Sequence, residues 1–375
     1  MKLKELLIQN KSSEYIGAPE NETFVTVSQK GQGLSRRDTS GNRTPVPFTG
    51  TRIKEGQFVY AKIGAFQGSF GIVPKSLDNA VVSKDFPVFD VSDAIIPDFL
   101  LLSLLTPSVL NTIEKHSTGA LLKRCKEEQF LNIEISVPSK DIQRKIVNMI
   151  QAVDTCIMET QHRLELLDEL VKSRFIELFG DPISNPKGWK TDKTENHIDL
   201  LSGFPFDSSQ YTENGINICG GLIIMPQRIE WKDCKHWGSV QGYEEYTLKE
   251  NDIVIALDRP WISEGFKIAM VDAEHLPALL IQRTARIRAI GINQLYLMYC
   301  FLLGDFDKHC NVTGSLVPHI SAKDIRSFAI MLPPLDLQKQ FATFVEQTDK
   351  SKLAITETLK YLEELKASLM SQYFG

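Results

Sequence analysis

Residues 138–180, PSKDIQRKIVNMIQAVDTCIMETQHRLELLDELVKSRFIELFG, recur in altered form at residues 333–375, PPLDLQKQFATFVEQTDKSKLAITETLKYLEELKASLMSQYFG. A shift of 195 residues aligns the two stretches with eleven identities in 43 ungapped pairs. The same shift places Thr118-Gly119 on Thr313-Gly314, outside the aligned tails. The remaining sequence of the two halves differs. The chain is therefore an internal duplication, in which each half is a globular region followed by a tail.

Each tail carries apolar residues at alternating steps of four and three, which is the seam of a heptad helix. The seam of the first tail consists of Ile146, Ile150, Val153, Ile157, Leu164 and Leu167, with Thr160 and Val171 at the remaining positions. The seam of the second tail consists of Phe341, Val345, Ile355, Leu359 and Leu362, with Thr348, Lys352 and Lys366 at the remaining positions. Prolines precede both stretches, and Gly180 and Gly375 end them, as is typical of helix boundaries.

A helix of about 38 residues is about 57 Å long, so a small domain cannot cover its whole seam. The seams therefore predict that the two helices pair with each other. The chain between them has to return to its start, which favours an antiparallel coiled coil. Two alternatives remain open from the pattern alone: two long core helices in separate domains, or a coiled coil between two chains.

The globular regions combine short β-rich runs with one apolar helical stretch each, at 98–105 and 293–303. Each region closes with a short predicted strand, at 132–137 or 327–332. We expect an α+β fold with a pseudo-two-fold duplication. Its parts are a first globular domain at 1–138, a first long helix at 139–180, a second globular domain at 181–334 and a second long helix at 335–375.

The composition and the motifs point away from an enzyme or a membrane protein. No apolar run has the length of a membrane span, and the first residues lack the apolar core of a signal peptide. The six cysteines form no Cys-x-x-Cys pair, and neither a nucleotide-binding loop nor an amino-methyltransferase signature occurs. We therefore expect a non-catalytic cytoplasmic protein with no cofactor, no metal site and no membrane contact.

Several motifs resemble the specificity subunits of type I restriction-modification systems, and the resemblance covers essentially the whole chain. The motifs are Leu332-Pro333-Pro334-Leu335-x-Leu337-Gln338-Lys339-Gln340, Leu178-Phe179-Gly180-Asp181-Pro182 followed by Asn185-Pro186-Lys187-Gly188-Trp189, and the two Thr-Gly-x-Leu segments at 118 and 313. The first tail departs from the pattern, because Val137-Pro138-Ser139 stands in place of Pro-Pro.

The resemblance implies two target-recognition domains that read the two halves of a split site in double-stranded DNA. It implies that the helices act as a spacer and a docking surface. It also implies a prokaryotic cytoplasm and, as partners, two methyltransferase subunits and two restriction-translocase subunits.

A net charge of −5 is unusual for a DNA-binding protein, so the distribution of the basic residues along the chain matters. Residues 24–62 hold seven basic and two acidic side chains, whereas residues 223–290 hold nine basic and ten acidic ones. The candidate DNA contacts of the first domain are Lys30, Arg36, Arg37, Arg43, Arg52, Lys54, Lys62, Thr118 and Gly119. Those of the second domain are Arg228, Lys232, Lys235, Arg259, Lys267, Thr313 and Gly314.

Each candidate also has a simpler interpretation. The charged residues could form an ordinary solvated surface, and each Thr-Gly pair could form a tight turn. A net negative charge on a DNA-recognition protein is compatible with DNA binding if partner subunits supply much of the phosphate contact.

A coiled-coil adaptor without a nucleic-acid role is the alternative function. It leaves unexplained why the globular regions diverge while the tails stay alike.

Overall fold

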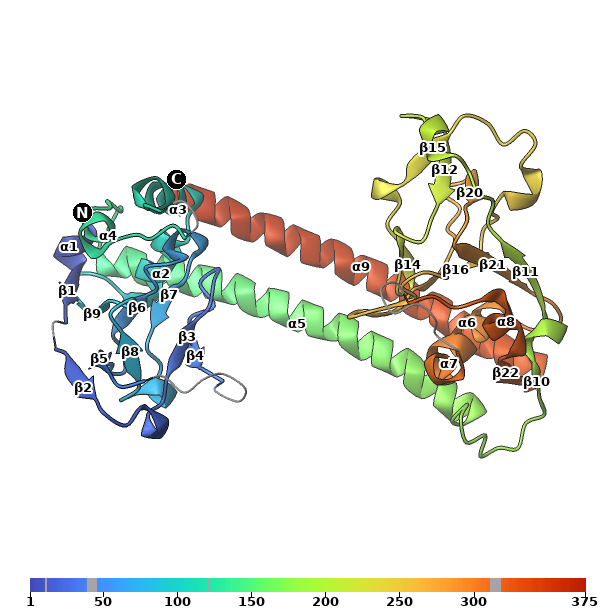
Figure 1. The fold of residues 1–375 in the computed structure, drawn as a ribbon, viewed down its shortest axis with the longest axis horizontal. Coiled ribbons are helices and arrows are strands. Elements are labelled where there is room, and N and C mark those ends of the chain that lie inside the picture. Colours follow the sequence, from blue (N-terminus) through green and yellow to red (C-terminus); the bar gives the residue numbers. More distant parts are fainter. Residues whose placement is uncertain (11, 39–45, 120–121, 311–317) are drawn as a thin grey trace. The chain divides into compact units, whose positions relative to one another are not determined.

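The computed structural model describes residues 1–10, 12–38, 46–119, 122–310 and 318–375 (Figure 1). It divides into two compact units. Unit 1 contains Met1–Gln161 and Glu357–Gly375, and unit 2 contains His162–Thr356. Both units mix helices and sheets, and two long helices join them, so the fold class predicted from the sequence is confirmed.

The two tails form the long helices α5 (Lys140–Phe179) and α9 (Leu335–Phe374), each of 40 residues. In unit 1 the first turns of α5 share a core with the last turns of α9. Ile146 and Ile150 belong to this core, and Met370 and Phe374 pack against it. The Nζ of Lys366 lies 2.5 Å from the Oδ1 of Asp154 in the same unit.

Unit 2 contains the opposite ends of the two helices. The ring of Phe341 on α9 lies 5.4 Å from that of Phe175 and 5.7 Å from that of Phe179, both on α5. Lys352 Nζ lies 2.6 Å from Asp168 Oδ1. Within each unit, later residues of α5 thus meet earlier residues of α9, so the helices run antiparallel in both.

The heptad seam is the covered face of each helix. All eleven apolar residues assigned to the seam are buried or half-buried. Its two lysines, Lys352 and Lys366, keep their stems along the seam while their ammonium groups bind carboxylates of α5. The two ion pairs are fourteen residues, or two heptads, apart on each helix.

One of the duplicated identities has a structural role at the start of each long helix. Gln143 is fully buried, accepts a hydrogen bond from the Ile96 backbone N–H at 2.8 Å and donates to the Pro138 carbonyl at 2.9 Å. Gln338 likewise accepts from the Asn293 N–H at 2.8 Å and donates to the Pro333 carbonyl at 2.8 Å. Each glutamine ties the start of its long helix to the start of the domain's apolar helix, where backbone groups lack partners.

Unit 1 is built around a four-stranded antiparallel sheet in the order β1-β9-β6-β7. Its strands are β1 (Leu7–Gln9), β9 (Val88–Val91), β6 (Phe58–Tyr60) and β7 (Phe70–Ile72). Beside it lie a sheet of β2 (Glu14–Ile16), β5 (Phe48–Arg52) and β8 (Val81–Ser83), and a hairpin of β3 (Val25–Val27) and β4 (Leu34–Arg36). The helices of this unit are α1 (Leu3–Leu6), α2 (Pro97–Leu104), α3 (Pro107–His116) and α4 (Glu127–Leu131).

Unit 2 repeats this plan with additions. Its four-stranded sheet has the order β11 (Ile198–Ser202), β21 (Thr284–Ala289), β16 (Ile253–Ala256) and β19 (Ile268–Met270). Its helices are α6 (Gln294–Leu303), α7 (Phe306–His309) and α8 (Ala322–Ser327). A three-stranded sheet has the order β15 (Lys235–Trp237), β12 (Ile216–Cys219) and β20 (Ala278–Leu280). Three two-stranded sheets pair β10 (Thr191–Lys193) with β22 (Ala329–Met331), β13 (Ile224–Met225) with β14 (Arg228–Ile229), and β17 (Trp261–Ile262) with β18 (Gly265–Phe266). The 195-residue shift carries β6 onto β16 and α4 onto α8.

The two predicted closing strands have different outcomes. The segment at 327–332 contains β22, which pairs with β10. The segment at 132–137 forms only an isolated bridge between Glu134 and Lys2. Its partner, the N-terminus, turns into helix α1 at Leu3 and leaves no extended backbone to continue the pairing.

Candidate nucleic-acid interface

The two units share a backbone contact at the end of β6 and at the end of β16, here called the strand-end junction. In unit 1, Ile63 pairs with Arg124, and the Cys125 N–H donates to the Lys62 carbonyl at 2.9 Å. In unit 2, Asp258 pairs with His319, and the Ile320 N–H donates to the Leu257 carbonyl at 2.9 Å. Each of these residues is related to its counterpart by the 195-residue shift, so the duplication includes the junction.

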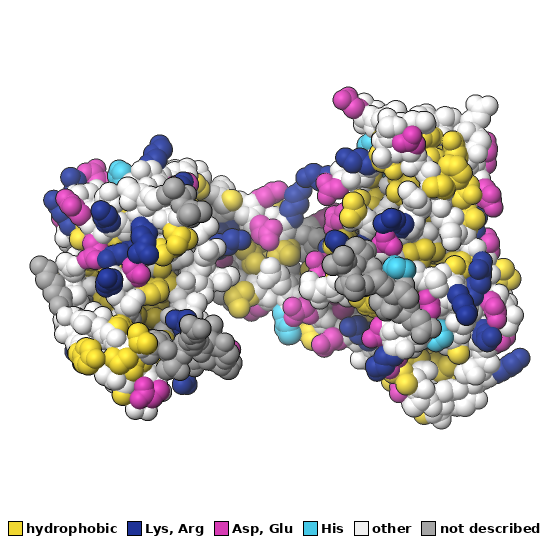
Figure 2. All heavy atoms as spheres, in the orientation of Figure 1, with side chains coloured by type: hydrophobic (Ala, Val, Ile, Leu, Met, Phe, Trp, Pro, Cys, Tyr) yellow, Lys and Arg dark blue, Asp and Glu magenta, His cyan; other side chains and the backbone are white. Residues whose placement is uncertain are grey.

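The side chains around the two junctions differ. In unit 1, Lys62 bonds Glu127 at 2.8 Å, and Arg124 bonds Asp85 at 2.8 Å. Lys123 bonds Glu114 at 2.5 Å, and its ammonium lies 5.6 Å from the centre of the Phe66 ring. Figure 2 shows Lys and Arg side chains gathered over the α3 and α4 side of unit 1, with carboxylates among them. This face is rich in cations, and many of them are already paired.

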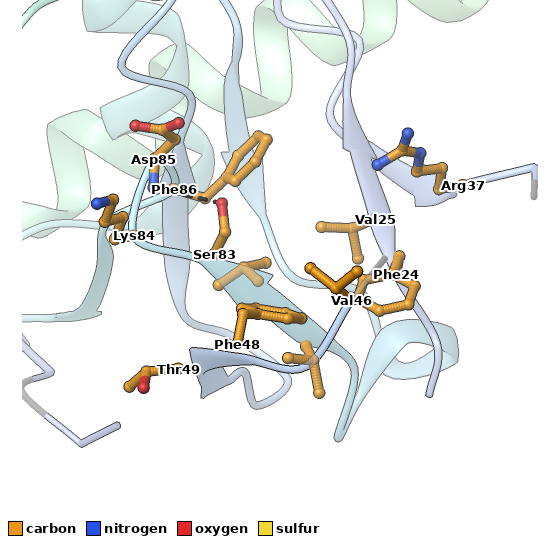
Figure 3. A pocket seen from close by; sticks show the side chains of 12 residues that line it. Phe24, Val25, Arg37, Val46, Phe48, Thr49, Ser83, Lys84, Asp85 and Phe86 are labelled. Carbon is orange, nitrogen blue, oxygen red and sulfur yellow. Dashed lines mark hydrogen bonds between the residues drawn. The ribbon is translucent and has the colours of Figure 1, made fainter. Parts of the chain in front are cut away.

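A hollow of about 570 Å³ adjoins this region of unit 1 (Figure 3). Its walls combine apolar and polar side chains and include Phe24 and Phe48, whose rings are 6.1 Å apart. Arg37 stands at one margin in Figure 3 and Lys84 at the other. A second hollow of about 320 Å³ shares Arg37 and Asp85 and continues toward Ile63 at the junction. The carboxylate of Asp85 lies on the same rim as Lys84 and also lines the second hollow.

Most of the predicted contacts of the first domain lie on the surface. Lys30, Arg36, Arg37 and Lys54 are exposed, and none of them forms a salt bridge with a described residue. Lys62 is half-buried in its ion pair. Arg43 lies outside the described residues.

Arg52, in contrast, binds other residues of unit 1. Its guanidinium bonds Glu14 at 2.7 Å and Glu22 at 2.9 Å, and donates to the Asn79 carbonyl at 2.9 Å. The hydrogen bonds to Glu22 and Glu14 outweigh partial burial and raise the pKa of Arg52, and the same contact with Arg52 lowers the pKa of Glu22. Arg52 therefore joins β5 to the first residue of β2 and to the segment before β3, rather than pointing outward unpaired.

The Thr-Gly pair of the first domain lies beside the strand-end junction. Thr118 and Arg124 exchange two backbone hydrogen bonds, of 3.0 and 2.8 Å. Gly119 has a φ of +121°, and a Cβ placed there would lie 2.3 Å from the Leu122 carbonyl oxygen. Position 119 therefore requires glycine for steric reasons, and Thr118 pairs directly with Arg124 of the junction. Thr313 and Gly314 fall outside the described part of the chain.

The predicted contacts of the second domain separate into three groups. Lys232, Lys235 and Arg259 are exposed. Arg228 is exposed but bonds Glu230 at 2.7 Å and Glu264 at 3.1 Å. Lys267 is 6% exposed and donates to the Gly221 carbonyl, and both burial and the charge of Arg259 lower its pKa. An ammonium enclosed in this way does not fit a solvent-facing phosphate contact.

Three cationic residues of this surface are not among the contacts predicted from the sequence. Lys84 and Arg124 lie beyond the basic window, which ends at residue 62, and Arg283 follows a buried strand and was not assigned to the surface. The duplication could have found Arg124, because only three residues separate the repeated Thr-Gly pair from Lys123-Arg124 in the first half.

Two kinds of feature are missing from the part of the chain that the structure describes. None of the described helices combines the length and the apolar character that a bilayer crossing requires. Within the same ranges, no group of three or more His, Cys, Asp or Glu side chains is arranged to hold a metal ion.

The known proteins that resemble this chain are described as specificity subunits of type I restriction systems. The model of the type I restriction modification DNA specificity domain matches residues 2–169 and 203–366. The EcoAI specificity subunit of Escherichia coli is 29% identical over 174 residues, which are 44% of this chain and 29% of that protein. The MjaVIII specificity subunit of Methanocaldococcus jannaschii is 24% identical over 277 residues, which are 69% of this chain and 65% of that protein. The matches thus span less than two thirds of the length of these two relatives.

Two solved structures resemble the whole chain. One, described as the structural basis of complex assembly and conformational transition of the type I R-M system, has a TM-score of 0.59 and 18% identity, and covers 100% of this chain and 96% of its own. The other, a type I restriction-modification S subunit from M. genitalium, has a TM-score of 0.57 and 15% identity, and covers 100% of this chain and 95% of its own. At these identities the likeness concerns the fold.

The contact of Glu22 with Arg52 predicts a pH-dependent stability. Because Arg52 lowers the pKa of Glu22 below 4.5, ionised Glu22 stabilises unit 1 above that pH, and the contribution is lost as the pH falls through the lowered pKa. Arg52→Gln should therefore cost about 1 kcal/mol at pH 7 and less at pH 3. Urea unfolding at both pH values measures the difference. Lys54→Gln, at an exposed neighbour, is the control, and an equal loss at both pH values would contradict the assignment.

Proposed function

This chain belongs to the type I restriction-modification DNA specificity family, and from that membership we propose that it reads a bipartite DNA sequence for a restriction-modification complex. The observation that carries the proposal is the strand-end junction, which occurs in both units with different side chains around it. Two domains that recognise different DNA sequences require the same backbone framework and different surface side chains. In this proposal methyl transfer and cleavage are carried out by partner subunits, and the chain contributes recognition.

We assign the first recognition domain to residues 1–138 and the second to residues 181–334. The proposed contacts of the first domain are the exposed cations Lys30, Arg36, Arg37, Lys54, Lys84 and Arg124, of which Arg37 and Lys84 line the hollow and Arg124 lies at the junction. Those of the second are Lys232, Lys235, Arg259 and Arg283. Cations at these places hold phosphates and set the orientation of the duplex, while bases are read at their edges in the grooves.

In this proposal α5 and α9, each about 60 Å long, act as the spacer between the half-sites. The base pairs between the half-sites then go unread. A helix pair suits this role because the number of residues fixes its length.

Exposed apolar side chains on the long helices support two equivalent docking places for a partner. Unit 1 exposes Met158 on α5 with Tyr361 and Leu365 on α9, and unit 2 exposes Leu353 on α9 with Leu166 and Leu170 on α5. The 195-residue shift converts the first set into the second. We propose that each set binds one methyltransferase subunit, which gives two copies per chain, and that two restriction subunits join them.

Loss of proposed phosphate contacts should reduce the salt dependence of DNA binding. In the complex with its methyltransferase subunits, Arg37→Gln and Lys84→Gln should each lower the slope of log K against log salt by about 0.9. Binding titrations at several salt concentrations measure the slope. Lys75→Gln, at an exposed lysine that lines neither hollow, is the control, and unchanged slopes in both variants would remove this surface from the interface.

Lengthening both helices should lengthen the unread part of the DNA site. Methylome sequencing of a host that expresses this chain with its methyltransferase should give a bipartite motif. Four residues inserted at facing positions of α5 and α9 add about 6 Å, so the spacer of the motif should grow by about one or two base pairs.

Replacing residues 1–138 with another reader is the control for that experiment, because it should change one half-site and leave the spacer as it was. An insertion that leaves the spacer unchanged contradicts the role of the helices. A single undivided motif would contradict the proposed function itself.

Charged substitutions at the exposed apolar sets should remove partner subunits one at a time. Tyr361→Asp with Leu365→Asp should weaken one methyltransferase copy by about 2 kcal/mol or more, and Leu166→Asp with Leu170→Asp should weaken the other. Native mass spectrometry of the assembled complex counts the copies. Glu169→Gln and Glu364→Gln, at exposed equivalent positions, are the controls. Loss of both copies from either variant would contradict two separate places.

A further inference from the structure

Leu222 has an unusual position for an apolar residue. Its side chain is 91% exposed, which exceeds every other large hydrophobic side chain in the part of the chain that the structure describes. It follows Gly220-Gly221 and precedes Ile223-Ile224, both of which are buried. The leucine therefore projects from the surface on a segment whose other apolar side chains point inward.

The turn that carries Leu222 is firmly held. The Ile223 N–H donates to the Gly220 carbonyl at 3.1 Å, and the Glu230 N–H donates to the Ile223 carbonyl at 2.8 Å. The buried ammonium of Lys267 donates to the Gly221 carbonyl. These bonds fix the backbone on both sides of Leu222, so its exposure follows from the fold of the turn.

The glycines let this turn lie close to the sheet. A Cβ at Gly220 would lie 2.8 Å from the Cδ1 of Ile281, so a larger residue there would have to displace the end of that side chain. A Cβ at Gly221 would lie 3.6 Å from the Cβ of Ala256 at the end of β16. Leu222 thus emerges directly beside the strand-end junction of unit 2.

The neighbours of Leu222 at the junction are cationic. The carbonyl of Arg283 lies 3.7 Å from the Cβ position of Gly221, and the guanidinium of Arg283 is exposed and bonds Asp258 at 2.7 Å. The exposed Arg259 follows Asp258 and lies near enough to Lys267 to affect its ionisation. An apolar partner protein would place Arg259 and Arg283 in an unfavourable environment, whereas a polyanion accommodates them and the leucine together.

We propose that Leu222 is a wedge that enters the DNA half-site of the second domain and parts two adjacent base pairs, while Arg259 and Arg283 bind the flanking phosphates. The inference rests on the proposed function and adds a contact to it. Insertion of an apolar side chain between base pairs is a known means of kinking a duplex, and it requires a projecting, well-supported residue. The turn at residues 220–223 supplies such a residue.

The test uses the complex of this chain with its methyltransferase subunits and the bipartite site found by methylome sequencing. 2-Aminopurine is placed at successive positions of the half-site read by the second domain, and its fluorescence reports unstacking. The wild-type complex should raise the fluorescence at one step. Leu222→Ala should abolish the rise and weaken specific binding about tenfold, with an unchanged salt slope. Leu222→Met should retain both properties.

Matched variants separate this role from other effects. Ile290→Ala, at another exposed apolar residue of unit 2, should bind DNA like the wild type, whereas Arg259→Gln and Arg283→Gln should reduce the salt slope. The proposal is overturned if no position of the half-site responds in the wild type, or if Leu222→Ala binds the specific duplex normally. Loss of a methyltransferase subunit from Leu222→Ala would instead identify a protein as the occupant. A wild-type complex without sequence preference would refute the proposed function itself.

Discussion

The constraint on which the structure depends is that a 40-residue helix has to cover an apolar seam along its whole length. A small domain covers only a few turns, and a second helix with a matching seam covers the rest. The duplication supplies that helix within the same chain. The pairing is also specific, because the α5 counterparts of Lys352 and Lys366 are Ile157 and Val171. In each unit a lysine of α9 meets an aspartate of α5, a complement that two copies of α5 would lack.

The frame could be predicted from the sequence because it depends on periodicity. Heptad spacing located both long helices, and the prolines and glycines at their ends placed the boundaries within a few residues of those observed. The repeated Gln143 and Gln338 also belong to this frame, since each ties its long helix to the adjacent domain helix. Much of the identity between the tails therefore records a shared scaffold.

The surface could not be predicted in the same way, because it depends on contacts between distant residues. In the sequence Arg52 is one of seven cations between residues 24 and 62. Its ion pairs with Glu14 and Glu22 form only in the folded chain. Lys267 is an ordinary lysine in the sequence, and its burial follows from the turn at Gly221 that packs over it. Lys84 lies far from the window in sequence, yet it lines the same hollow as Arg37.

The pairing of surface cations bears on how such a chain can bind DNA. Arg124, Arg228 and Arg283 each already bond a carboxylate, so a phosphate that replaces the carboxylate gains little electrostatic energy. With a net charge of −5, general attraction to DNA is weak. In the proposed function, affinity then has to come from the partner subunits, and this chain contributes discrimination through shape and base contacts. A recognition subunit with low intrinsic affinity for DNA also avoids tight binding at the many nonspecific sites of a genome. A strongly basic subunit would stay bound at those sites.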